Sequence, residues 1–128
     1  MVRSDKRAIG DNAESLAQRF LQQEGLTPVQ RNFHCRLGEL DLIMQDGNCL
    51  VVIEVRFRGT HSFVAASHTV DRRKQQKILR TTALFLAWNE RFANSPVRFD
   101  VVGIDADARG EPSISWIRDA FRPADTRL

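Results

Sequence analysis

The sequence predicts an α/β domain in which a mixed β-sheet of about five strands is flanked by helices, in the order αβββαββ. Two features carry this prediction. From about Asp11 to Glu24, apolar residues recur at helical spacing, and Gly25 follows as a terminator. Residues 39–45 and 48–57 are strongly β-prone and flank Asp46-Gly47, a strong short-range signal for a hairpin.

The remaining elements complete the sheet and its cover. A short strand is expected at 29–33, and residues 50–53 are apolar on both faces, which is typical of a central strand. A second helix is expected from Thr69 or Asp71 to about Asn89, and the connection through it is long enough for a right-handed crossover. Strands follow at 97–105 and 113–117, with a turn at 107–110.

The length of 128 residues fits one domain with its own core. We expect a flexible, mildly basic tail at 1–9, the domain at 10–122 and a loop at 58–68. No apolar run reaches the length of a membrane helix, and the N-terminus has no signal-peptide stretch, so we expect no membrane contact and a cytoplasmic location. Cys35 and Cys49 are too few for a disulfide framework and are interpreted as free thiols.

Positive charge gathers in one part of the chain. Residues 56–80 contain seven cations and one anion, a local excess of +6, whereas the whole chain carries +3. The cations are Arg56, Arg58, Arg72, Arg73, Lys74, Lys77 and Arg80. Arginine predominates, and its planar fork suits phosphate. Charge alone favours a phosphate-binding surface and a solvated helix face equally.

The hairpin brings acidic residues together. A two-residue loop at Asp46-Gly47 places Asp41 opposite Val52, and the same ladder places Glu39 opposite Glu54. Since residues opposite each other and residues two apart share a face, one side of the sheet is expected to carry Glu39, Asp41, Glu54 and Arg56. The diagonal from Asp41 to Glu54, roughly 7–8 Å, lets both carboxylates reach one ion.

The position of Glu54 indicates either a metal site or an ion pair. In the apolar stretch 51–55 a lone carboxylate is costly unless it is paired or bound to metal. Converging carboxylates suit Mg²⁺ or Mn²⁺, which can activate water and stabilise charge on a phosphodiester that Arg56 holds. A salt bridge to Arg56 or Arg58 explains the same pattern equally well. Glu14 can lean toward the same ion, although an exposed first-turn acid is the commoner situation.

Several motifs occur in a characteristic order along nearly the whole chain. They are Gly10…Ala13-Glu14, Gly38-Glu39-Leu40-Asp41-Leu42-Ile43, Val52-Ile53-Glu54-Val55-Arg56-Phe57-Arg58, Lys74…Lys77-Ile78, Arg98-Phe99-Asp100-Val101-Val102 and Trp116-Ile117-Arg118-Asp119-Ala120-Phe121. In this order, over about residues 10–121, they resemble the YraN family of uncharacterised bacterial proteins.

The YraN family is similar in turn to the restriction-endonuclease-like superfamily, especially archaeal Holliday-junction resolvases, whose signature is a helix Glu, a strand Asp and Glu-x-Lys on the next strand. The resemblance implies a restriction-endonuclease-like fold and a metal site made of Glu14, Asp41, Glu54 and the main-chain carbonyl of Val55. Arg56 stands where the superfamily has lysine. An arginine can stabilise a pentavalent phosphorane, but it does not deprotonate and so cannot act as a general base. Lys74 is an alternative for that role.

Three hypotheses for function follow. The first is a Mg²⁺- or Mn²⁺-dependent nuclease acting on branched or otherwise non-standard DNA, in which Asp41, Glu54 and Arg56 are catalytic and Glu14 assists. Its contacts to the phosphates of the DNA backbone would come from the 58–68 loop and the second helix: Arg58, Arg72, Arg73, Lys74 and Lys77. The second is a nucleic-acid-binding module with little or no catalysis, and the third is a protein-interaction domain whose acidic cluster is only structural. Resolvase-like enzymes usually work as dimers, so a homodimer is an assembly to consider.

Overall fold

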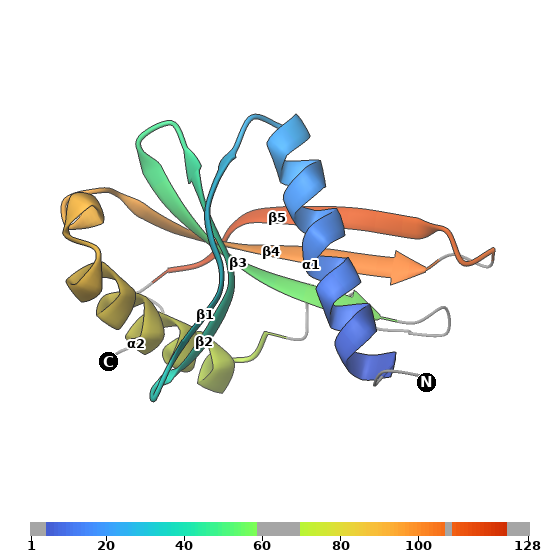
Figure 1. Cartoon of the computed structure of the whole chain (residues 1–128), viewed down its shortest axis with the longest axis horizontal. Coiled ribbons are helices and arrows are strands. Elements are labelled where there is room, and N and C mark those ends of the chain that lie inside the picture. Colours follow the sequence, from blue (N-terminus) through green and yellow to red (C-terminus); the bar gives the residue numbers. More distant parts are fainter. Residues whose placement is uncertain (1–4, 59–69, 107–108, 123–128) are drawn as a thin grey trace.

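The computed structural model describes residues 5–58, 70–106 and 109–122. Its elements are α1 (Asp5–Gln23), β1 (Thr27–Cys35), β2 (Gly38–Asp46), β3 (Cys49–Arg58), α2 (Arg72–Trp88), the short 3₁₀ helix η2 (Glu90–Phe92), β4 (Val97–Ala106) and β5 (Pro112–Phe121). This confirms the predicted α/β class and the order αβββαββ (Figure 1). In the described part of the chain, no helix is long and apolar enough to cross a membrane.

All five strands form one mixed sheet in the spatial order β1-β2-β3-β4-β5. The pair β3–β4 is parallel and the other three pairs are antiparallel. The strand predicted to be central, β3, lies in the middle of the sheet, and its residues from Leu50 to Ile53 are all buried. A strand with both faces covered needs apolar side chains on both faces, which explains that run.

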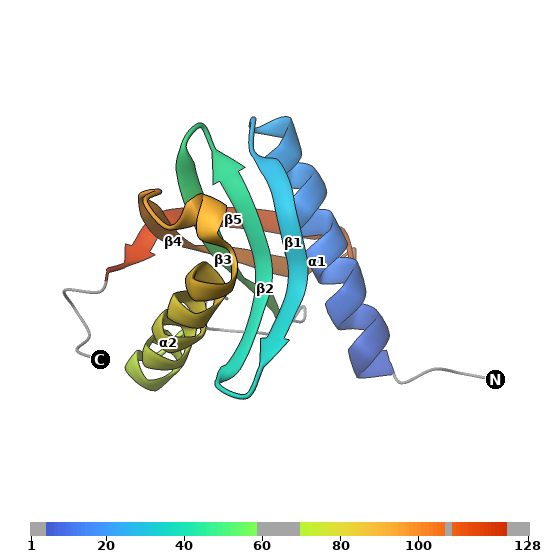
Figure 2. The ribbon, with the colours of Figure 1, turned by 60° about the vertical axis from the view of Figure 1, so that its left-hand side comes forward.

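The two helices cover opposite faces of the sheet, on either side of β1 and β2 in Figure 2. On β3, Val51 and Ile53 belong to the cluster that packs under α1, whereas Leu50 and Val52 belong to the cluster that packs under α2. The buried residues of α1 are Ala13, Ala17 and Leu21, and those of α2 are Ile78, Leu79, Thr81, Thr82 and Phe85. Because β3 alternates strictly here, Glu54 follows Val52 on the α2 side.

The turn between β2 and β3 differs from the prediction. The loop is Gly47-Asn48 rather than Asp46-Gly47, and Asp46 pairs with Cys49. Gly47 has a φ of +63° at the first central position, where type II′ hairpin turns need glycine. The predicted pairing of Asp41 with Val52 is therefore wrong, since Val52 pairs with Ile43. The shift is two residues, so it does not exchange the faces of the sheet.

The predicted alternation along β2 fails at Asp41. Leu40 belongs to the α2-side core and Leu42 to the α1-side core, although strict alternation would put both on one face. On the neighbouring strand β1, Asn32 has a positive φ of 53° between Phe33, which pairs with Leu40, and Arg31, which pairs with Leu42. In both strands, the alternation of side chains between the two faces of the sheet thus reverses at the same level.

Several predicted boundaries also change. Helix α1 begins at Asp5, inside the stretch 1–9 that was predicted to be a tail, and β5 continues past 117 to Phe121. Arg58 ends β3 instead of opening a loop, and the rest of the predicted 58–68 loop lies outside the described residues. The start of α2 agrees with the prediction, because the Asp71 side chain accepts a hydrogen bond from the Lys74 amide at 2.9 Å and caps the helix.

A buried carboxylate, Asp100 on β4, forms an ion pair with Arg98 on the same strand and is linked to β5 by hydrogen bonds. Asp100 is 1% exposed and accepts two hydrogen bonds from Arg98, Nε to Oδ1 at 2.9 Å and Nη2 to Oδ2 at 3.0 Å. The Trp116 indole N–H and the Asp119 amide also donate to this carboxylate, each at 2.9 Å. Arg98 further reaches Asp46 Oδ2 at 3.1 Å, which ties β4 to the end of β2.

We expect Asp100→Ala to lower the free energy of unfolding by about 3 kcal/mol, because it leaves the Arg98 guanidinium and two N–H donors without their acceptor. Urea unfolding followed by circular dichroism measures this loss. Asp105→Ala, on the same strand, is the matched control and is expected to change stability by less than about 0.5 kcal/mol. Equal losses in the two variants would contradict the structural role given to Asp100.

Candidate active site

The candidate site lies where β2 and β3 part. Their last backbone pair is Leu42 with Ile53, and beyond it β3 continues beside β4 alone. We call this place the β2–β3 fork. One step past the last pair, Asp41 Oδ2 accepts a hydrogen bond from the Val55 amide at 3.0 Å, so a side chain takes the place of a main-chain carbonyl.

Glu54 lies beside Asp41 at the fork. It is 5% exposed, and the two carboxyl groups lie close enough for each to shift the pKa of the other. We refer to Asp41 and Glu54 as the acid pair. The sequence analysis expected these residues to meet across a diagonal, whereas the observed register brings them level with each other.

Two cations contact the same oxygen of the acid pair. Arg56 Nη2 lies 3.6 Å from Glu54 Oε1, and Lys74 Nζ lies 3.5 Å from it. Arg56 comes from the same strand, two residues on, and Lys74 reaches over from the first turn of α2. Lys74 was predicted as a contact to nucleic acid and as an alternative for the superfamily lysine, and the structure places it against the acid pair.

Burial dominates the electrostatics of the acid pair. The pKa of Glu54 is raised to about 7, chiefly by burial and then by the charge on Asp41, against the lowering effects of Lys74 and Arg56. The pKa of Asp41 is also raised, again chiefly by burial, against the lowering effect of the Val55 hydrogen bond and the charge on Lys74. Burial therefore disfavours the ionised form of both carboxyl groups, and the neighbouring cations offset that effect only in part.

The acid pair fits a divalent cation by its donor chemistry. Carboxylate oxygens are the ligands that Mg²⁺ and Mn²⁺ prefer, and a cation would relieve the effects that raise both pKa values. Glu14, the predicted third carboxylate, forms an ion pair with Arg31 at 3.7 Å on β1. Within residues 5–58, 70–106 and 109–122, no three His, Cys, Asp or Glu side chains are grouped so as to hold a metal. The roles of Glu14 and the Val55 carbonyl stay predictions.

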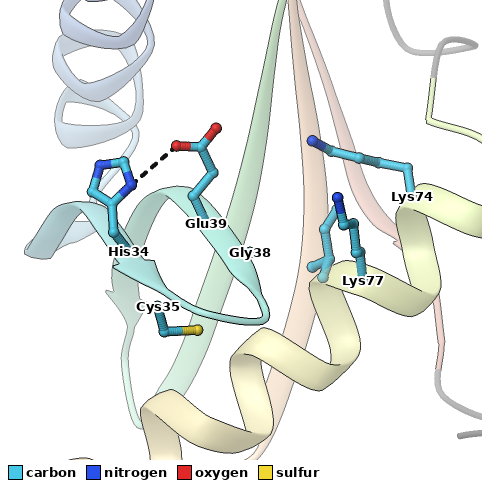
Figure 3. Close-up of a pocket in the computed structure, with 7 residues that line it drawn as sticks. His34, Cys35, Gly38, Glu39, Lys74 and Lys77 are labelled. Carbon is cyan, nitrogen blue, oxygen red and sulfur yellow. Dashed lines mark ion pairs between the residues drawn. The ribbon is translucent and has the colours of Figure 1, made fainter.

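A pocket opens next to the acid pair, between α2 and the tip of the β1–β2 hairpin. It has a volume of about 270 Å³ and is lined by His34, Cys35, Gly38, Glu39, Lys74, Lys77 and Ile78. We call it the hairpin pocket. Figure 3 shows the Lys74 side chain extending from α2 toward β2, with Lys77 beside it and Glu39 paired with His34. The His34 Nδ1 to Glu39 Oε2 distance is 3.2 Å.

A glycine sets how closely the hairpin approaches α2. Gly38 has a φ of +151°, and a Cβ there would lie 2.9 Å from Thr81 Oγ1. That hydroxyl is fixed, since it donates to the Lys77 carbonyl at 2.8 Å. Only glycine therefore allows this approach, which forms one wall of the hairpin pocket.

The other predicted phosphate-binding residues spread over the start of α2. Arg72, Arg73 and Lys77 are exposed there. A second hollow of about 460 Å³ lies along the same helix and is lined by Asp71, Arg73, Lys74, Gln76, Lys77 and Arg80. Arg58 is placed only by its backbone, opposite Asp105 on β4.

The sequence analysis missed the hairpin pocket. It considered Glu39 only as a member of the acidic face and gave His34 and Gly38 no role in a site. The available signals were Gly38-Glu39, directly after the Arg36-Leu37 turn, and the spacing of Lys74 and Lys77 by one helical turn.

Comparisons with known proteins place the chain in a family. The model of the uncharacterised protein family UPF0102 matches residues 13–104. A UPF0102 protein from Saccharophagus degradans is 49% identical over 112 residues, which cover 88% of this chain and 91% of that protein. One from Nitrosococcus oceani is 46% identical (88% of this chain, 90% of that protein), and one from Stutzerimonas stutzeri is 44% identical (92% and 98%). The chain belongs to the UPF0102 family, the YraN-like proteins that its motifs resemble.

Proposed function

We propose that this protein is a metal-dependent nuclease that acts on DNA, with Mg²⁺ or Mn²⁺ held by Asp41 and Glu54. The observation that carries the proposal is the acid pair itself. Two carboxyl groups meet at the end of a strand pair, one of them 5% exposed, with a lysine and an arginine within 4 Å. Buried acids with raised pKa values beside basic side chains are typical of catalytic sites.

Asp41 and Glu54 would have different tasks. Asp41 is oriented by the Val55 amide, which donates to its Oδ2. Glu54 lies beside this acid partner, with Arg56 and Lys74 both at its Oε1. The cation, when bound, supplies charge that stabilises the phosphodiester undergoing attack and lowers the pKa of bound water.

Arg56 and Lys74 would contact the substrate phosphate. Both already lie beside Glu54 Oε1. A phosphate oxygen bound at the same place would replace the Glu54 carboxylate as their anionic partner. Arg56 offers a two-point contact, whereas Lys74 offers a single ammonium on a flexible stem. Which of them takes the role of the superfamily lysine stays open, and the cleavage test below addresses it.

The exposed arginines of α2 support DNA as the substrate. Arg72 and Arg73 stand on the turn that also carries Lys74, so a backbone held by them passes close to the acid pair. Contacts of this kind recognise backbone and shape rather than base sequence. The resolvase resemblance favours branched DNA and a homodimer as the working assembly.

A binding module with little or no catalysis is the second candidate. One observation favours it: Arg56 and Lys74 already form ion pairs with Glu54, so the acid pair is partly neutralised by side chains. Nucleic acid would then bind through the α2 cations while the acid pair stabilises the fold. Cleavage separates the two candidates.

The cleavage test compares wild type with Glu54→Gln and Arg56→Lys, with Mn²⁺ and Mg²⁺, on duplex, single-stranded, flap and four-way DNA. We expect weak wild-type cleavage with Mn²⁺, none in Glu54→Gln, and DNA binding kept in both. Arg56→Lys lowers cleavage if the two-point contact matters, and raises it if a lysine is required at this position. If neither wild type nor Arg56→Lys cuts any substrate while both bind DNA, the binding module is correct.

The second test measures where the DNA backbone lies. Arg72→Ala/Arg73→Ala is expected to flatten the log–log dependence of affinity on salt by up to about 1.8 for duplex DNA, about 0.9 for each lost phosphate contact. Lys74 is kept, because it also contacts Glu54. The control is Arg19→Ala/Arg118→Ala, which removes two exposed cations from α1 and β5. An equal effect of both double variants would place the DNA on another surface.

A further inference from the structure

The hairpin pocket shares one residue with the acid pair. Lys74 lines the pocket and also contacts Glu54 at 3.5 Å, so the two sites are continuous. The charge on Glu39, on the far wall, is close enough to raise the pKa of Asp41. A ligand that reaches the acid pair would therefore extend into this pocket.

The pocket has the charge of an anion site. Lys74 and Lys77 stand one helical turn apart, about 4.5 Å along the axis. Among the ion pairs of the described residues none involves Lys77, and Lys74 is shared with Glu54. The one lining carboxylate, Glu39, faces His34 at 3.2 Å. Protein groups thus leave the Lys77 ammonium available to a ligand.

The walls of the pocket are fixed by packing. Gly38 lies against Thr81, whose hydroxyl bonds the carbonyl of Lys77. The backbone that carries Lys77 and the hairpin that carries Glu39 are therefore held at a set separation. Preorganised walls lower the entropic cost of binding.

We propose that the hairpin pocket is a phosphate subsite, in which Lys77, assisted by Lys74, binds a phosphate of the DNA strand next to the one that faces the acid pair. The inference rests on the proposed function, since it takes DNA as the ligand. The phosphate is either an internal phosphodiester or a terminal phosphomonoester, which share the chemistry recognised here. Glu39 limits the affinity, because its carboxylate repels the same anion.

Opposite effects of two neutralising variants test the subsite. Binding is measured in EDTA, without cleavage, to a short single strand carrying a 5′-phosphate or a 5′-hydroxyl. Lys77→Ala is expected to weaken binding on the order of tenfold, the loss of one charge-assisted contact. Glu39→Gln is expected to tighten binding about twofold to fivefold, which a merely structural residue would not do. Arg19→Ala and Glu90→Gln, exposed and away from the pocket, are the matched controls.

Cysteine alkylation locates the contact. Cys35 lines the pocket and Cys49 does not, and both are free thiols. Bound oligonucleotide is expected to slow alkylation of Cys35 in wild type, to do so less in Lys77→Ala, and to leave Cys49 unchanged. Tighter binding of the 5′-phosphate strand than of the 5′-hydroxyl strand would show that the pocket binds a terminal phosphate. Equal affinity for the two strands would show that it binds an internal phosphodiester.

Two results would overturn the subsite: equal affinities in Lys77→Ala, Glu39→Gln and their controls, or no protection of Cys35 by bound DNA. Failure of wild type to bind any DNA would overturn the proposed function as well. Failure of cleavage alone would leave the subsite standing on a binding module, because every arm of this experiment is free of metal and independent of catalysis.

Discussion

The hydrogen bond from the Val55 amide to the Asp41 carboxylate is the contact on which the site depends. Where β2 and β3 part, the Val55 N–H loses its main-chain partner on β2, and a half-buried amide without an acceptor is costly. Asp41 supplies that acceptor. The same bond orients the carboxylate beside Glu54. The contact that satisfies the Val55 amide at the end of the strand pair therefore also positions the acid pair.

Charge balance then decides what the fork can do. The acid pair is buried and the pKa of each member is raised, chiefly by burial, even though Lys74 and Arg56 lie beside Glu54. A cation bound at the acid pair and an anion bound near the two basic side chains would each stabilise such a site. A phosphodiester together with a divalent ion meets both needs, whereas either ligand alone leaves the balance incomplete. This is the physical reason for preferring the nuclease over the structural salt bridge.

Much of the fold follows from local patterns in the sequence. The apolar run 50–53 identified the central strand, and Asp71 marked the start of α2 by its capping chemistry. The side chains of Glu54 and Arg56 could be assigned to one face because β3 is regular there. Their meeting with Asp41 was anticipated, although by the wrong register, because an error of two residues keeps the face of every side chain.

The rest depended on tertiary structure. The choice between Asp46-Gly47 and Gly47-Asn48 as the loop is not visible in a β-prone hairpin with glycine at its centre. The reversal at Asn32 and Asp41 is a local change in backbone conformation, which strict two-residue periodicity does not predict. Lys74 reaches Glu54 only because α2 docks on that face, and Gly38 permits this docking through its contact with Thr81. Long-range packing therefore determines how Lys74 meets a site whose acids and Arg56 were already predicted from the sequence.

The most direct test of the account is a Mn²⁺ titration of ¹⁵N-labelled protein, with each amide followed by NMR. The central claim is that the acid pair at the fork holds a divalent ion. It predicts that paramagnetic broadening sets in first at the amides of Asp41, Glu54 and Val55, is reversed by excess Mg²⁺, and is lost in Asp41→Asn. Broadening that begins at exposed acids such as Glu90 or Glu24, or that is the same in wild type and Asp41→Asn, would contradict the claim.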